Sequence, residues 1–246
     1  MKKHLLFILP LIIGAFIASA QTAATSTMVQ MIEWKYKSAR ELQSTYGVSR
    51  AYWMEKMPEI TSRFGFTSET GRYYGFTNTD GMPDMGKYIG AREQVTESFK
   101  KDHPDIYKKI IDNMDGPSIR SYWKIADDIS NTSQDYDPNK FDYRKMILFS
   151  VPNGTATQFE DLMKEVIKEE KRAGIDLTRI YAKSMEGYPS NYYILMYPDG
   201  DELSYYQKKS QREVLRRKSP VLQDMLEKVK AMMTIVRIDH LNRIKF

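Results

Sequence analysis

The residue best suited to proton transfer is His240, which stands between Arg237, Asp239 and Arg243 near the C-terminus. Histidine changes its charge near neutral pH, so His240 can act as a base if it lines a pocket. On a strand, neighbouring side chains point to opposite faces, so His240 and Asp239 cannot pair with each other. The alternative interpretation, which we favour, is a core or rim histidine with one hydrogen bond.

Aromatic side chains form the second candidate site. All three tryptophans lie in the first half of the chain, and the 17 tyrosines make up much of an aromatic content of 12%. Such residues can line a cavity for an apolar or planar ligand, and ordinary core packing is the alternative. The predicted ligand-binding residues are Trp34, Tyr36, Trp53, Tyr73, Tyr122, Trp123 and Tyr192.

Residues 208–218 (KKSQREVLRRK) contain six basic residues and one acidic residue. This stretch can bind an anionic surface or partner, although a solvated helix face is the favoured interpretation. The formal charge of +5 is mild, and we predict no nucleic-acid partner. Metal-binding, nucleophile-elbow and phosphate-loop motifs are absent from the sequence, and we predict neither a metal nor a cofactor.

The first twenty residues resemble a secretory signal peptide. Lys2 and Lys3 precede an apolar run from Leu5 to Phe16, and Ala18-Ser19-Ala20 fits a cleavage site before Gln21. A retained anchor is the alternative, but the run is short for a membrane span. The chain has no cysteine, which excludes disulfides and thiolate chemistry. We expect an exported bacterial protein, periplasmic or extracellular, with no stable membrane span after cleavage.

The positioning elements follow from hydrophobic periodicity. In the first half we expect strands at 28–37, 59–66, 72–79 and 118–126, with helices at 39–57, from about 84, and at 105–115. In the second half we expect strands at 145–151, 177–185, 191–197 and 234–244, with helices up to Gly174, at 202–217 and from Pro220. The first strand alternates, with Ile32 and Trp34 on one face and Glu33 on the other, which indicates half burial.

Each half therefore has the order β-α-β-β-α-β, the ferredoxin-like topology. A short echo supports a repeat: residues 73–81 read YYGFTNTDG and residues 192–200 read YYILMYPDG, at an offset of 119. Arg92-Glu93 likewise corresponds to Arg212-Glu213. We predict an α+β protein with a signal peptide at 1–20, a first repeat at 28–126, a linker at 127–144 and a second repeat at 145–246.

Two such repeats in one chain resemble the dimeric α+β barrel superfamily, which includes NIPSNAP-like, EthD-like, stress-responsive barrel and chlorite dismutase-like proteins. The resemblance implies that the two sheets close into one intrachain barrel with helices outside. Chlorite dismutase-like members bind haem through a histidine on a helix of the second repeat. This chain departs from that pattern, because His103 lies in the first half and His240 on the last strand.

We expect the barrel to enclose a Tyr- and Trp-rich cavity that binds a small, largely apolar or aromatic ligand. One alternative is a cofactor-independent oxygenase or isomerase, in which His240, Arg120 or a tyrosine acts on a bound substrate. Another is an interaction protein that uses the basic stretch on a cell-surface partner. The sequence leaves both a monomer and a homodimer open.

Overall fold

The computed structural model describes residues 27–58, 63–132 and 140–245. The first repeat contains β1 (Met28–Lys35), α1 (Ala39–Lys56), β2 (Arg63–Ser68), β3 (Arg72–Thr79), α2 (Met82–Asp102), α3 (Pro104–Asn113) and β4 (Ile119–Ile125). The second contains β5 (Tyr143–Ser150), α4 (Ala156–Arg172), β6 (Ile180–Glu186), β7 (Tyr192–Asp199), α5 (Glu202–Arg217), α6 (Pro220–Met232) and β8 (Thr234–Arg243). The predicted fold class is confirmed: the chain is an α+β protein with two ferredoxin-like repeats.

Local sequence signals explain where most helices begin. The side chains of Ser38, Asp201 and Ser219 each accept a hydrogen bond from a main-chain N–H in the first turn of the helix that follows. Proline occupies the first turn of α2, α3 and α6, where its missing N–H costs nothing. These signals place the helices that cover the two sheets.

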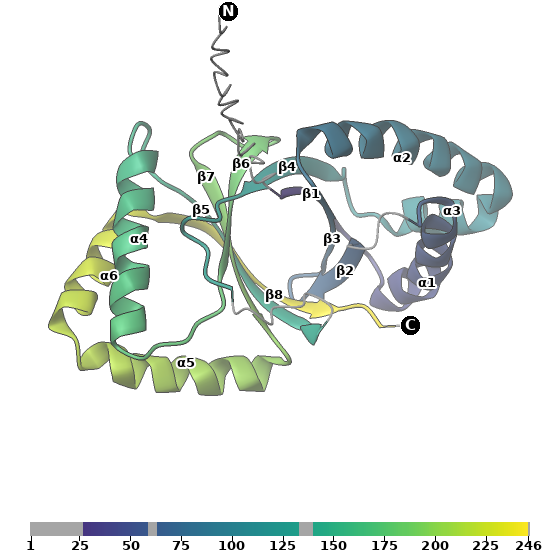
Figure 1. Cartoon of the computed structure of the whole chain (residues 1–246). Helices are drawn as coiled ribbons and strands as arrows, with labels where there is room; N and C mark the ends of the chain where they lie inside the picture. Colours follow the sequence, from purple (N-terminus) through teal and green to yellow (C-terminus); the bar gives the residue numbers. More distant parts are fainter. Residues whose placement is uncertain (1–26, 59–62, 133–139, 246) are drawn as a thin grey trace, which may run out of the picture.

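The eight strands form one closed antiparallel barrel in the order β1-β3-β2-β8-β5-β7-β6-β4. The sheet of the first repeat joins that of the second where β2 pairs with β8 and where β4 pairs with β6. Helices α1, α2 and α3 cover one side of the barrel, and α4, α5 and α6 cover the other (Figure 1). Every strand therefore has one face toward the barrel interior and one toward the exterior.

The barrel interior is filled by one cluster of buried side chains. They are Val29, Met31, Phe64, Phe66, Tyr74, Phe76, Trp123, Met146, Leu148, Ile180, Ala182, Ile194, Met196 and Leu241. The outer face of the second sheet packs on its helices through a separate cluster around Phe149, Phe159 and Tyr193. The first sheet has two smaller outer clusters, around Trp53 and around Trp34. The first strand is thus buried on both faces, and the expectation of half burial was wrong.

Part of the region predicted as a linker packs against the second repeat. Ile129 is completely buried, and Asn131 forms an isolated bridge with Arg179. Strand β5 already begins at Tyr143. The predicted signal peptide, residues 59–62 of the second predicted strand and residues 133–139 lie outside the described residues. Within the described residues, no helix has the length and apolar character needed to cross a membrane.

Candidate functional site

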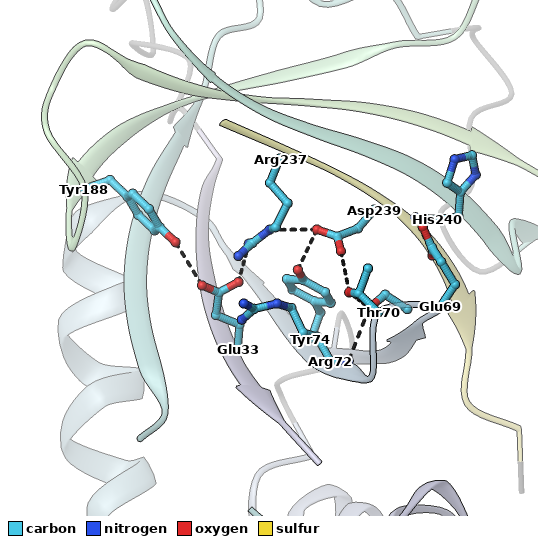
Figure 2. A network of polar contacts seen from close by, with 10 residues as sticks. Glu33, Glu69, Thr70, Arg72, Tyr74, Tyr188, Arg237, Asp239 and His240 are labelled. Atoms are coloured by element: carbon cyan, nitrogen blue, oxygen red, sulfur yellow. Dashed lines mark hydrogen bonds and ion pairs between the residues drawn. The ribbon is translucent and has the colours of Figure 1, made fainter. Parts of the chain in front are cut away.

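A network of charged and hydroxyl groups lies inside the barrel at the end where β1 finishes and β3 begins (Figure 2). Glu33 comes from β1, Tyr74 from β3, and Arg237 and Asp239 from β8. Strand alternation places Glu33 on the same face as Val29 and Met31, and it places Asp239 on the same face as Leu241. Both carboxyl side chains are completely buried.

Arg237 links the two carboxylates. Its guanidinium forms an ion pair with Glu33, and its Nε lies 2.8 Å from Oδ2 of Asp239. The same guanidinium lies 5.5 Å from the centre of the Tyr74 ring, a cation–π distance. The side chain of Arg237 remains 20% exposed. The network therefore reaches solvent through Arg237 while its two anions stay buried.

Three hydroxyl groups donate hydrogen bonds to the two carboxylates. The Tyr74 hydroxyl donates to Asp239 at 2.7 Å, and the Thr70 hydroxyl donates to the other Asp239 oxygen at 2.9 Å. The Tyr188 hydroxyl donates to Glu33 at 2.9 Å. Burial raises the pKa of Tyr74 well above its ordinary value of 10.0. Burial, followed by the charge of Glu33, raises the pKa of Tyr188 to about 12. Both phenols are therefore protonated donors at neutral pH.

Aromatic rings stand beside this network. The ring centroid of Tyr188 lies 5.4 Å from that of Trp123 and 5.8 Å from that of Tyr192. Trp123 is completely buried, and its indole N–H donates to the hydroxyl of Ser121 at 2.7 Å. Tyr188 and Tyr192 are partly exposed at the end of the barrel. The site thus combines an aromatic wall with buried anions and a half-buried cation.

The second repeat provides an internal comparison for this site. Glu33 pairs with Tyr74 across β1 and β3, and the corresponding pair across β5 and β7 is Leu148 with Ile194. On the other side of Glu33, its partner across β1 and β4 is Ile119. The partner of Leu148 across β5 and β8 is Arg237, so Ile119 corresponds to Arg237. By the same registers, Ser121 corresponds to Asp239. The fold is therefore built with apolar or neutral residues at the same positions, and the charged network is not a requirement of the barrel.

The structure does not bring the two predicted catalytic residues together. His240 lies on the outer face of β8, where its Nδ1 is 2.6 Å from the Tyr143 hydroxyl and 3.4 Å from Glu202. Its side chain points away from Asp239, as strand alternation predicts (Figure 2). Arg120 is exposed on β4, which is four strands away from β8 in either direction around the barrel.

The seven predicted ligand-binding aromatics divide among three clusters. Trp123 and Tyr192 lie in or against the interior cluster, next to the charged network. Trp34, with Tyr36 and Tyr73 against it, belongs to an outer cluster that includes Leu42 of α1. The remaining two, Trp53 and Tyr122, pack beneath the helices of the first repeat. Only Trp123 and Tyr192 therefore meet at the candidate site.

Sequence reasoning missed the charged members of the site. Glu33 was assigned to a solvent face, because a single acidic residue in an alternating strand usually marks that face. Tyr188 lies between the strands predicted at 177–185 and 191–197 and is not among the predicted site residues. The signal that could have found them is that both faces of a strand are buried when a sheet closes into a barrel with helices outside.

The basic stretch at 208–218 is not one solvated face. Arg212 is buried in α5, and Arg216 forms ion pairs with Glu170 and Glu213.

Two open surface grooves lie over α4 and the end of β4, and Asp128 lines both of them. In the part of the chain that the structure describes, no group of three or more His, Asp or Glu side chains could hold a metal ion.

No protein-family model and no curated protein matches the sequence. Solved structures do share the fold. A proposed monooxygenase of Fusobacterium nucleatum subsp. nucleatum superposes with a TM-score of 0.56 at 12% identity, covering 90% of this chain and 94% of that one. A proposed monooxygenase of Lactobacillus acidophilus gives 0.53 at 13% identity, covering 89% and 95%. Chlorite dismutase of Candidatus Nitrospira defluvii, solved with imidazole, gives 0.51 at 9% identity, covering 89% and 91%. These likenesses show the dimeric α+β barrel fold.

The residues of the second repeat do not fit a haem that is ligated from one of its helices. Helices α4, α5 and α6 contain no histidine. The layer between these helices and the sheet is filled by completely buried rings, among them Phe149, Phe159 and Tyr193.

Proposed function

We propose that the protein binds a small, largely apolar or aromatic molecule at the charged end of its barrel. The observation that carries this proposal is that Glu33 and Asp239 are both completely buried and share one guanidinium. In this proposal the ligand meets the charged network with its polar end and lies against the three neighbouring rings of Trp123, Tyr188 and Tyr192.

The energetics support a role other than stability. Burying charges costs several kcal/mol per ion, and their mutual attraction repays this cost only with very good geometry. The residue equivalent to Glu33 in the second repeat is Leu148, and those equivalent to Arg237 and Asp239 in the first repeat are Ile119 and Ser121, none of which carries that cost. Residues that break a local rule without a compensating gain in stability are expected at functional sites.

The composition of the site indicates the class of ligand. Aromatic rings favour a planar apolar body, which stacks or meets them edge-on. Two carboxylates against one guanidinium favour a ligand that brings hydrogen-bond donors or a positive charge. We therefore expect an aromatic molecule with a hydroxyl or amino group directed at Glu33. We also propose that the protein meets this molecule after export, because its first twenty residues have the pattern of a signal peptide.

One observation favours a second candidate, a cofactor-independent isomerase. Tyr188 donates a hydrogen bond to Glu33 at the partly exposed end of the network, so a phenol donor and a carboxylate that can act as a base lie side by side. In this reaction Glu33 would take a proton from one substrate atom and return it to a neighbouring one. Tyr188 would stay protonated and donate to the oxygen on which charge develops. No atom is gained or lost.

The experiment is to express the whole chain, purify the protein after export, extract it with organic solvent and identify bound compounds by mass spectrometry. The wild type should carry a compound in near-stoichiometric amount. Glu33→Gln and Tyr188→Phe should lower its amount at least tenfold, whereas Tyr107→Phe, on the distant helix α3, should not. Equal amounts in all variants would place the ligand elsewhere. Conversion of the added compound by wild type but not by Glu33→Gln would favour the isomerase.

A further inference from the structure

The two places where the sheets join are not covered alike. At the junction of β4 with β6, the β6–β7 hairpin packs on β4 so closely that a Cβ on Gly187 would lie 2.7 Å from the main-chain oxygen of Arg120. At the junction of β2 with β8, the pairing covers only Phe66–Ser68 against Leu241–Arg243. The short turn between β2 and β3 contacts β8 at Asp239 and His240. The Thr70 hydroxyl donates to the Asp239 carboxylate, and the Glu69 carboxylate accepts from the main-chain N–H of His240.

The segment Thr234–Ile238 of β8 is therefore paired on one side only among the described residues. The main-chain N–H of His240 points away from β5, because it donates to Glu69. In an antiparallel pair this direction alternates, so the N–H and C=O of Ile238 also point away from β5. A strand edge of this kind can pair with a strand of another chain.

The same segment exposes apolar side chains, and a register shift between Leu148 and Phe149 of β5 leaves Val236 without a partner on that strand. Ile235, Val236 and Ile238 are 54%, 50% and 39% exposed. They continue into His240, whose ring stacks on that of Tyr206 with centroids 6.1 Å apart. We call Ile235, Val236, Ile238, His240 and Tyr206 the β8 stripe. The strand registers place Arg120 of the first repeat in the position of Ile238, so the fold itself is compatible with a solvated cation there.

The charges around the β8 stripe are balanced. Glu202 and Glu69 lie on one side of His240, within contact of its ring and its main-chain N–H. Lys145 pairs with His240 across the strands, and Lys209 lies over the Tyr206 ring at 5.7 Å. Two acidic and two basic residues suit a partner with the same balance. In a twofold contact each charge can meet its opposite on the other copy.

We propose that the protein forms a homodimer in which the Thr234–Ile238 edge pairs antiparallel with the same segment of a second copy. The pairing satisfies the outward main-chain groups of Ile238 and buries the apolar side chains of the β8 stripe against their own copies. Arg237 lies within this segment, so the second copy also closes the barrel wall beside the charged network. This inference is independent of the ligand.

The first test is the mass in solution, measured by light scattering on protein purified after export. The wild type should have twice the protomer mass at tens of micromolar. Ile238→Arg, which copies the residue of the other repeat, should have the protomer mass with an unchanged circular dichroism spectrum. The matched control Met54→Lys changes a residue that is 51% exposed on α1, and it should remain dimeric.

A second test uses the absence of cysteine from the chain. In an antiparallel twofold pair, Val236 of one copy lies near Val236 of the other, so Val236→Cys should oxidise to a covalent dimer within minutes of adding copper phenanthroline. Met54→Cys should cross-link at least tenfold more slowly. A wild type that stays monomeric at these concentrations, a dimer that persists in Ile238→Arg, or equal cross-linking of both cysteine variants would overturn the proposal.

Discussion

Replacing Arg237 with methionine tests the charged network most sharply. Methionine keeps much of the volume of the aliphatic side chain but removes the cation that forms ion pairs with both Glu33 and Asp239. Breaking a buried ion pair by removing one partner costs about 3–5 kcal/mol. Arg237 itself is 20% exposed, so water can enter beside it, and we expect the lower end of that range, about 3 kcal/mol, at pH 8.

The variant keeps the hydroxyl groups that donate to Glu33 and Asp239 and removes the guanidinium that these carboxylates share. The expected cost therefore reports on the guanidinium alone.

Guanidinium denaturation followed by tryptophan fluorescence measures this cost, because Trp123 is buried in the same cluster. The matched control is the triple variant Glu33→Gln, Arg237→Met and Asp239→Asn, which removes all three charges together. Neutral replacement of a whole buried charge cluster is often close to neutral in stability, so the triple variant should be more stable than Arg237→Met alone at pH 8. A loss below 1 kcal/mol in Arg237→Met would refute the reasoning.

Three further outcomes follow from the structure. Gly187→Ala should lower the free energy of unfolding by about 2–3 kcal/mol in denaturation experiments, because φ is +89° and the new Cβ would clash with the main chain of Arg120. The control is Gly71→Ala, where φ is +74° and no atom lies within 4 Å of the new Cβ, and it should cost only about 1 kcal/mol. Tyr74→Phe should cost about 1–3 kcal/mol, because it leaves an oxygen of buried Asp239 with one donor fewer. Ultraviolet titration should show the phenol of Tyr188, assigned with Tyr188→Phe, ionising near pH 12 rather than 10. Its raised pKa contributes stability that is complete below pH 10 and is lost as pH rises through 12, so global unfolding at pH 10–11 would contradict this outcome.

The elements of the fold could be predicted because their periodicity is local. The first predicted strand begins at the observed residue, and the helix predicted over 202–217 has the observed bounds. Pro220 predicted the start of the last helix, α6, at the observed residue. The pairing of β2 with β8 and of β4 with β6 could only be inferred from the resemblance, because these contacts join residues far apart in the sequence.

The sequence echo that indicated the repeat is displaced by one residue. Tyr73 and Tyr193 lie on outer faces, whereas Tyr74 and Ile194 lie in the barrel interior. Tyr74 of β3 therefore corresponds to Ile194 of β7, which is an offset of 120 residues and not 119. Arg92 and Arg212 are separated by the same 120 residues. A shift of one residue moves every side chain to the other face of a strand. The duplication was predicted correctly, but the matching of its tyrosines was wrong.

The candidate site was only partly predictable for the same reason. Trp123 and Tyr192 lie beside the network, and their predicted role in lining a ligand cavity stays a prediction, because protein side chains fill the described barrel interior. Glu33 was assigned to solvent, and His240 attracted attention through its chemistry although it lies outside the barrel. Which face of a strand is interior depends on barrel closure, and a pattern read one strand at a time does not contain that information.

A crystal structure of the purified protein tests the central claim most directly. We predict electron density for a small molecule at the charged end of the barrel, in contact with Glu33 or Arg237 and stacked against Tyr188 or Tyr192. An interior filled by protein side chains alone, with the Tyr188 hydroxyl still donating to Glu33 and no foreign density beside them, would contradict it.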